Sequence, residues 1–281
     1  MSTKHSRLLQ LPTEIKLSIW TYVCGDKLLH VHRDVDDDRI AYRICHSQDT
    51  EEAIHKRFMK RGNYTTKNLP EYIDPWLYHS TCEPQNDNLD LRFLRVCKSI
   101  YGEAKLIPYR SNTFSFQYPA LFTFFYHTFP PQHRDKVRRL HLHMEMGAKV
   151  IIHRDSQSWQ DAFLLRLIPA FRNSTHINIS IVLGSTACWN AKLPKDYRGW
   201  QTQWMPAVLA LKALPLKTAT VMIYDDVKRC DDHYSDPQNR QIHAEGASWS
   251  NRRGRTVRQD TAECIERELL AGGPVGRETT E

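Results

Sequence analysis

The chain has 281 residues, 41% of them hydrophobic and 10% aromatic, so it can bury a core and is not a disordered chain. No apolar run approaches the ~20 residues of a membrane span, and the start carries no stretch typical of a signal peptide. The net charge of +7 is spread along the chain, and the seven cysteines are scattered without close pairs. These features favour a reducing location, the cytoplasm or the nucleus.

Residues 8–25 predict an amphipathic helix with clear ends. Pro12 lies where the first turn of a helix accepts proline, and Gly25 is typical of the position that follows a helix. Ile15 and Ile19 recur between these ends at helical spacing. The helix therefore has an apolar side that either packs inward or is available to a partner.

Residues 28–32 alternate like a short strand, and residues 47–87 form a polar insert that prolines interrupt. Beyond the insert, residues 91–107 predict a second amphipathic helix, which Pro108 ends. Three residues of this second helix are expected to be buried against the first helix: Leu94, Ile100 and Tyr101.

The rest of the chain alternates between strands and helices, with a period of about forty residues in its later part. The expected elements are a strand at 111–116, an aromatic helix at 119–129, strands at 137–144, 175–183 and 218–224, and helices at 156–171, 200–214 and 261–271. Leu142, Ile179 and Val221 occupy equivalent positions of the last three strands. We expect these strands to be parallel, adjacent and in chain order, because right-handed crossovers join strands spaced in this way.

The predicted fold class is α/β, or α+β overall. A sheet covered on both faces reads as continuous apolar runs, whereas these strands alternate between apolar and polar residues. We therefore predict a helical N-terminal part followed by a short parallel βα-repeat, a solenoid-like sheet with helices mainly on one side; a doubly wound sheet is the alternative. The predicted regions are a helical part at 1–130 that includes the insert, a βα-repeat at 131–226, and a polar extension at 227–281 with a helix at 261–271.

Two sequence blocks carry a resemblance to known proteins. LLQLPTEIKLSIWTYV from residue 8 and LRVCKSIYGEAKLIPYRSNTFSF from residue 94 resemble the two halves of an F-box, here separated by the insert. With a following strand from Val137 to Leu142, they resemble an uncharacterised family of filamentous fungi that joins an F-box-like start to a leucine-rich-repeat-like body. The resemblance implies that the start grips a Skp-type adaptor of a cullin ubiquitin ligase and that the repeats select substrates. The adaptor-binding residues would be Leu11, Pro12, Ile15 and Ile19.

The outward positions of the last three strands predict a polar recognition surface on the sheet. Its expected members are His141, His143, Asn178, Ser180, Thr220 and Tyr224. Strand residues two positions apart share a face, so these side chains should form neighbouring columns. The alternative is that the C-terminal helix or the insert covers this face and completes the core.

No motif of catalytic serine, phosphate-binding or zinc-protease type is present. The metal-capable residues lack the close cysteine pairs of structural zinc sites; they are Cys24, His30, His32, Cys45 and His46. We therefore predict a non-enzymatic protein-interaction module without cofactor or metal. The alternatives are a nucleic-acid-associated protein that uses a basic surface, and an enzyme with a site near His141 and His143.

Overall fold

A computed structural model shows how these segments are arranged. It describes residues 6–34, 38–45, 89, 91–146, 159, 168–183, 208–225 and 252–272. The predicted insert at 47–87 lies outside the described residues, as do most of the predicted helices at 156–171 and 200–214.

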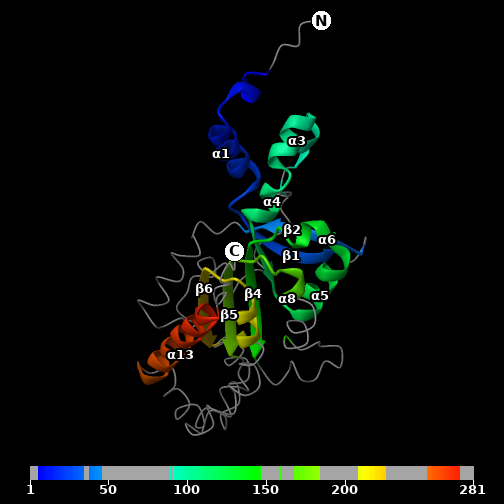
Figure 1. The fold of residues 1–281 in the computed structure, drawn as a ribbon. Helices are drawn as coiled ribbons and strands as arrows, with labels where there is room; N and C mark the ends of the chain where they lie inside the picture. Colours follow the sequence, from blue (N-terminus) through cyan, green and yellow to red (C-terminus); the bar gives the residue numbers. More distant parts are fainter. Residues whose placement is uncertain are drawn as a thin grey trace, which may run out of the picture.

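The centre of the protein is a six-stranded, mostly parallel sheet with the order β2-β1-β3-β4-β5-β6 (Figure 1). The strands are β1 (Leu28–Asp34), β2 (Arg39–Ile44), β3 (Thr113–Phe116), β4 (Arg139–Met146), β5 (His176–Leu183) and β6 (Thr218–Asp225). Among the described strands, only the β1–β2 pair is antiparallel. The expected mixed α/β architecture with a parallel sheet is confirmed.

The register of the last three strands follows the periodicity of the sequence. Leu142 pairs with Ile179, and Ile179 pairs with Val221, all in parallel strands. The prediction that these strands are adjacent, parallel and in chain order is therefore correct. The apolar residues that recur about every forty positions in the sequence therefore lie side by side on neighbouring strands.

The N-terminal part contains more strand than we expected. Residues 28–34 and 113–116 pair with each other, and residues 39–44 add an antiparallel edge strand. The sequence does not predict β2, because the charged residues of RIAYRI hide the alternation of Ile40, Tyr42 and Ile44. The first three strands thus join the same sheet as the last three.

The helices also differ in detail from the prediction. They are η1 (Arg7–Gln10), α1 (Thr13–Cys24), η4 (Arg92–Arg95), α3 (Lys98–Ala104), α4 (Ile107–Arg110), α5 (Pro119–Thr128), α6 (Pro131–Arg134), α8 (Ile168–Ala170), η7 (Leu211–Ala213) and α13 (Arg252–Ala271). The single helix expected over 91–107 is broken into η4, α3 and the start of α4. Pro108 lies in the first turn of α4 instead of ending a helix, since proline is tolerated there.

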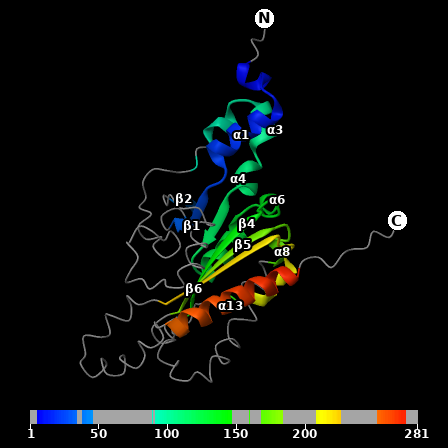
Figure 2. The same ribbon diagram turned by 90° about the vertical axis from the view of Figure 1, so that its left-hand side faces the viewer.

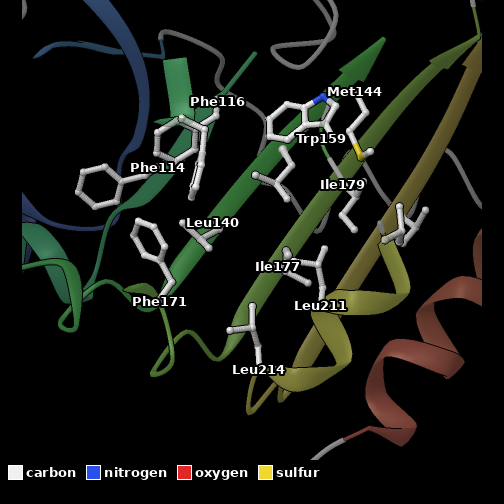
Figure 3. Packing of buried hydrophobic residues seen from close by; sticks show 14 of the residues in the cluster. Phe114, Phe116, Leu140, Met144, Trp159, Phe171, Ile177, Ile179, Leu211 and Leu214 are labelled. Atoms are coloured by element: carbon white, nitrogen blue, oxygen red, sulfur yellow. The ribbon is translucent and has the colours of Figure 1, made fainter. Parts of the chain in front are cut away.

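The main core lies on one face of the sheet (Figure 3). Phe114 and Phe116 of β3 meet Phe122 and Phe125 of α5, and Phe171 closes the group. Four of these rings are 0% exposed, and Phe114 is 2% exposed. The aromatic run that predicted a core helix at 119–129 therefore does form the core.

Helix α13 covers the β6 side of the sheet (Figure 2). It begins at Arg252, earlier than the helix expected over 261–271. Ala262, Ile265 and Leu269 are at most 1% exposed, and the Glu266 carboxylate accepts a 2.7 Å hydrogen bond from the backbone N–H of Val221. None of the described helices is long and apolar enough to cross a membrane.

Candidate docking site

Residues 7–24 and 91–110 form a helical arm that projects from one end of the sheet (Figures 1 and 2). The arm has its own small core, which is made of Trp20, Cys24, Ile100, Ala104 and Ile107. Segments from before and after the insert thus pack together, as we expected. The outcome for the three named residues is mixed: Ile100 is buried and Leu94 half-buried, but Tyr101 is 51% exposed.

The inward face of α1 is not the face that hydrophobicity predicts. Lys16, Trp20 and Cys24, spaced four residues apart, are its buried residues. The Lys16 ammonium donates a 2.7 Å hydrogen bond to Glu103 of α3, and the Trp20 indole donates to the same carboxylate at 3.5 Å. The hydrogen bond from Lys16 lowers the pKa of Glu103. A polar clamp therefore joins the two helices beside the stacked rings of Trp20 and Phe93.

Asn112 fixes the arm to the sheet. Its side-chain amide donates to the carbonyls of Cys24 at 2.8 Å and Pro108 at 2.9 Å, and its carbonyl accepts from the backbone N–H of Lys27 at 2.8 Å. The residue is 0% exposed. Gly25 suits the same joint, because a Cβ there would lie 2.9 Å from the Cβ of Ser111.

The predicted adaptor-binding residues lie on α1 and just before it, and only some of them face outward. Pro12 is exposed, Ile15 is 49% exposed, and Leu11 and Ile19 are half-buried. Tyr22 extends this stripe, since Ile15, Ile19 and Tyr22 follow the i, i+4, i+7 spacing of one helical face. Tyr22 is not among the predicted site residues, although its helical spacing is visible in the sequence. Tyr22 is 82% exposed.

Large exposed apolar side chains concentrate on the arm. Seven of the nine found in the described part of the chain belong to it: Ile15, Leu17, Tyr22, Val23, Leu91, Val96 and Tyr101. The exposed charges of the arm are six basic residues, Arg7, Arg92, Arg95, Lys98, Lys105 and Arg110, and one acidic residue, Glu14. The arm therefore presents an apolar and basic surface, whereas the sheet buries most of its apolar side chains.

The predicted recognition surface on the sheet is largely buried, which corrects our expectation that it faces solvent. His141 and Ser180 are 0% exposed, Asn178 is 7% and His143 is 8% exposed, and Thr220 is half-buried. The side-chain surroundings of Tyr224 lie outside the description. The alternation of polar and apolar residues correctly predicts which side chains share a face of the sheet, but it does not show that the polar face is buried.

A buried row of polar side chains replaces the expected open strip. The ring of His141 lies between two serine hydroxyls, with Nδ1 2.8 Å from Ser115 Oγ and Nε2 3.1 Å from Ser180 Oγ. Ser115 is 1% exposed. Both ring nitrogens thus link neighbouring strands, and neither hydroxyl is open to a substrate in this conformation. The described residues contain no group of three or more His, Cys, Asp or Glu side chains able to hold a metal ion.

Two further histidines on the sheet have altered acidity. Burial, with the nearby Arg43 guanidinium, lowers the pKa of His32. Burial, with the charges of Arg139 and Lys217, lowers the pKa of His176. Both rings therefore favour the neutral form at neutral pH and add little positive charge to the sheet.

Comparison with known proteins gives a family and no function. No curated protein and no solved structure matches the chain. A family described as a domain of unknown function, DUF7730, matches residues 1–229, which include the helical arm and all six strands. The chain therefore belongs to the DUF7730 family.

Proposed function

We propose that the protein is a non-enzymatic interaction module whose helical arm docks on another protein. The observation that carries this proposal is the concentration of exposed large apolar side chains on the arm. Removing such side chains from water is energetically favourable, so a partner that covers them gains binding energy. Contiguous exposed apolar patches mark interaction sites for this reason. Tyr22 is the strongest candidate anchor, because tyrosine is enriched among the few residues that contribute most of the energy of an interface.

The partner that we propose for the α1 stripe is a Skp-type adaptor of a cullin ubiquitin ligase. Support comes from the F-box-like sequence of the two segments and from their packing into one helical unit across the insert. Pro12, Ile15 and Tyr22 would contact the adaptor. The partly buried Leu11 and Ile19 would pack beneath them and hold them in place. The arm would then hold the rest of the chain at the ligase.

The sheet region would be the substrate-selecting part. We propose that β4, β5, β6 and their helices form a short leucine-rich-repeat-like body, because equivalent residues of these strands lie in direct register. The protein would act in the cytoplasm or nucleus. Among the described residues Cys24, Cys97 and Cys264 are free thiols, which suits a reducing compartment.

The burial of Ser115, His141 and Ser180 favours an interaction module over an enzyme. A nucleophile and its base must reach the substrate, and these groups instead satisfy one another across the sheet.

Binding to a recombinant Skp-type adaptor tests the proposal. We expect a complex with the full chain, and a loss of affinity of about tenfold or more when Ile15→Ala and Tyr22→Ala are combined. Both side chains are exposed, so the fold should survive the change. Leu270→Ala is the matched control, because Leu270 is a 41% exposed apolar residue of α13. An absent complex, or an equal loss in the control, would contradict the proposed docking.

A further inference from the structure

The outer face of α3 is a compact basic patch. Lys98, Tyr101, Gly102 and Lys105 follow the i, i+3, i+4, i+7 spacing of one helical face, and all four are exposed. Ile100, on the opposite side of the helix, is buried in the arm core. This patch is separate from the outward stripe of α1, because α1 contacts α3 through its inner side.

Gly102 has no evident role within the chain. A Cβ at this position would meet nothing within 4 Å, and the backbone is not in the left-handed region that favours glycine. Yet glycine inside an exposed helix costs stability relative to alanine. Gly25, in contrast, is explained by close contact with Ser111. The bare surface at Gly102 is therefore suited to contact with something outside the described chain.

The residues around Gly102 define what would fit there. The Lys105 ammonium lies 5.4 Å from the ring centre of Tyr101, and neither Lys98 nor Lys105 forms an ion pair within the described residues. A ligand would thus meet two available cations on either side of an exposed aromatic ring. Burying either lysine without an acidic partner would be costly, so the ligand must carry negative charge.

We propose that this face of α3 binds an acidic helix of a partner protein. Carboxylates of the partner would pair with Lys98 and Lys105, an apolar side chain would cover Tyr101, and the partner's backbone would pass over Gly102. Absence of a side chain lets two helices approach closely, as small residues do in tightly packed helix pairs. The exposed aliphatic Val96, two residues before Lys98 in the chain, favours a protein over a nucleic acid, whose binding relies on stacking and phosphate contacts.

This inference goes beyond the proposed docking of the α1 stripe and does not depend on it. The two are separable by experiment, because the α1 variants leave the α3 face intact. The arm would then hold two partners, or two parts of one partner, on opposite sides of its small core.

Gly102→Ala gives the sharpest test. Alanine should raise the melting temperature by about 2–4 °C, because it favours the helix. The same change should weaken binding of a synthetic Glu- and Leu-rich helical peptide about tenfold, because the methyl group holds the two backbones apart. Ser18→Ala is the control: it alters an exposed position of α1, and it should leave the affinity unchanged. An unchanged affinity in Gly102→Ala would overturn the close approach that we propose.

Charge reversal tests the identity of the ligand. The full chain should bind the acidic peptide, fail to bind its Lys-for-Glu counterpart, and bind more weakly as salt is added. Lys98→Glu combined with Lys105→Glu should reduce the affinity at least about tenfold, while the adaptor-binding assay should be unaffected. No binding of the acidic peptide, or tighter binding of a DNA duplex than of the peptide, would overturn the proposal.

Discussion

Asn112→Asp should loosen the joint between the helical arm and the sheet. The two side chains have nearly the same shape, so the change alters chemistry more than packing. Aspartate keeps an acceptor for the backbone N–H of Lys27 but loses the donors to the carbonyls of Cys24 and Pro108. A carboxylate would then face two carbonyl oxygens in a fully buried position.

The magnitude follows from the two lost hydrogen bonds. Leaving a buried polar group unsatisfied costs about 1–3 kcal/mol, so we expect a loss of about 2–6 kcal/mol for the two carbonyls together. That is a large part of the ~5–15 kcal/mol that stabilises a typical domain. Burial should also raise the pKa of the new carboxyl group. Its protonated form can donate one hydrogen bond, so part of the stability should return as the pH falls through this raised pKa.

Denaturant unfolding and hydrogen exchange would measure these effects. Exchange should increase first in the amides of the arm, since the joint opens there. Asn112→Ala should be destabilised without recovery in acid, and Asn173→Asp is the matched control, because its amide donates a single 3.0 Å hydrogen bond to the carbonyl of Asp135. If Asn112→Asp unfolds at the same denaturant concentration as the control, the joint does not hold the arm as we argue.

Three further predictions concern the core and the clamp. Ile265→Ala should cost about 2–5 kcal/mol in denaturant unfolding, because the side chain is 1% exposed; an unchanged midpoint would show that α13 is not part of the core. The hydrogen bond from Lys16 that lowers the pKa of Glu103 also stabilises the arm at neutral pH, and this stabilisation should disappear as the pH falls through the lowered pKa. Trp20 fluorescence should report this pH-dependent change, and Glu103→Gln should abolish the pH dependence. Burial raises the pKa of the Cys24 thiol to about 11, so iodoacetamide should modify the exposed Cys264 and spare Cys24 at neutral pH, as mass spectrometry can verify.

The parallel part of the sheet could be predicted because its signal repeats. Leu142, Ile179 and Val221 occupy equivalent positions in three strands of alternating polarity. Each strand must turn its apolar residues toward the same core, so the spacing of the strands predicts their order and register. The strand at 39–44 lacked such support. It is a single edge strand whose charged residues lie among apolar ones, and only its pairing with β1 reveals it.

The docking site was harder to predict, because a helix does not always bury its most apolar side. In α1 a lysine is buried, since Glu103 of a distant segment neutralises it, and tyrosine and isoleucine are left outside. Hydrophobic periodicity alone cannot anticipate a partner from beyond a long insert. The polar face of the sheet failed for a related reason: the pattern shows which residues share a face but not whether other parts of the chain enclose it.

The hydrogen bond from Val221 to Glu266 has a practical consequence for work on this family. A strand at the end of a sheet offers a row of backbone groups on which another chain can pair. In this protein the Glu266 carboxylate of α13 accepts a hydrogen bond from one of those backbone groups, and Ile265 and Leu269 of the same helix are buried. Yet α13 lies outside residues 1–229, the part of the chain that matches the family. Recombinant fragments cut at that boundary would keep the whole sheet and lose its cover, so they should precipitate or self-associate more than fragments that extend through Ala271.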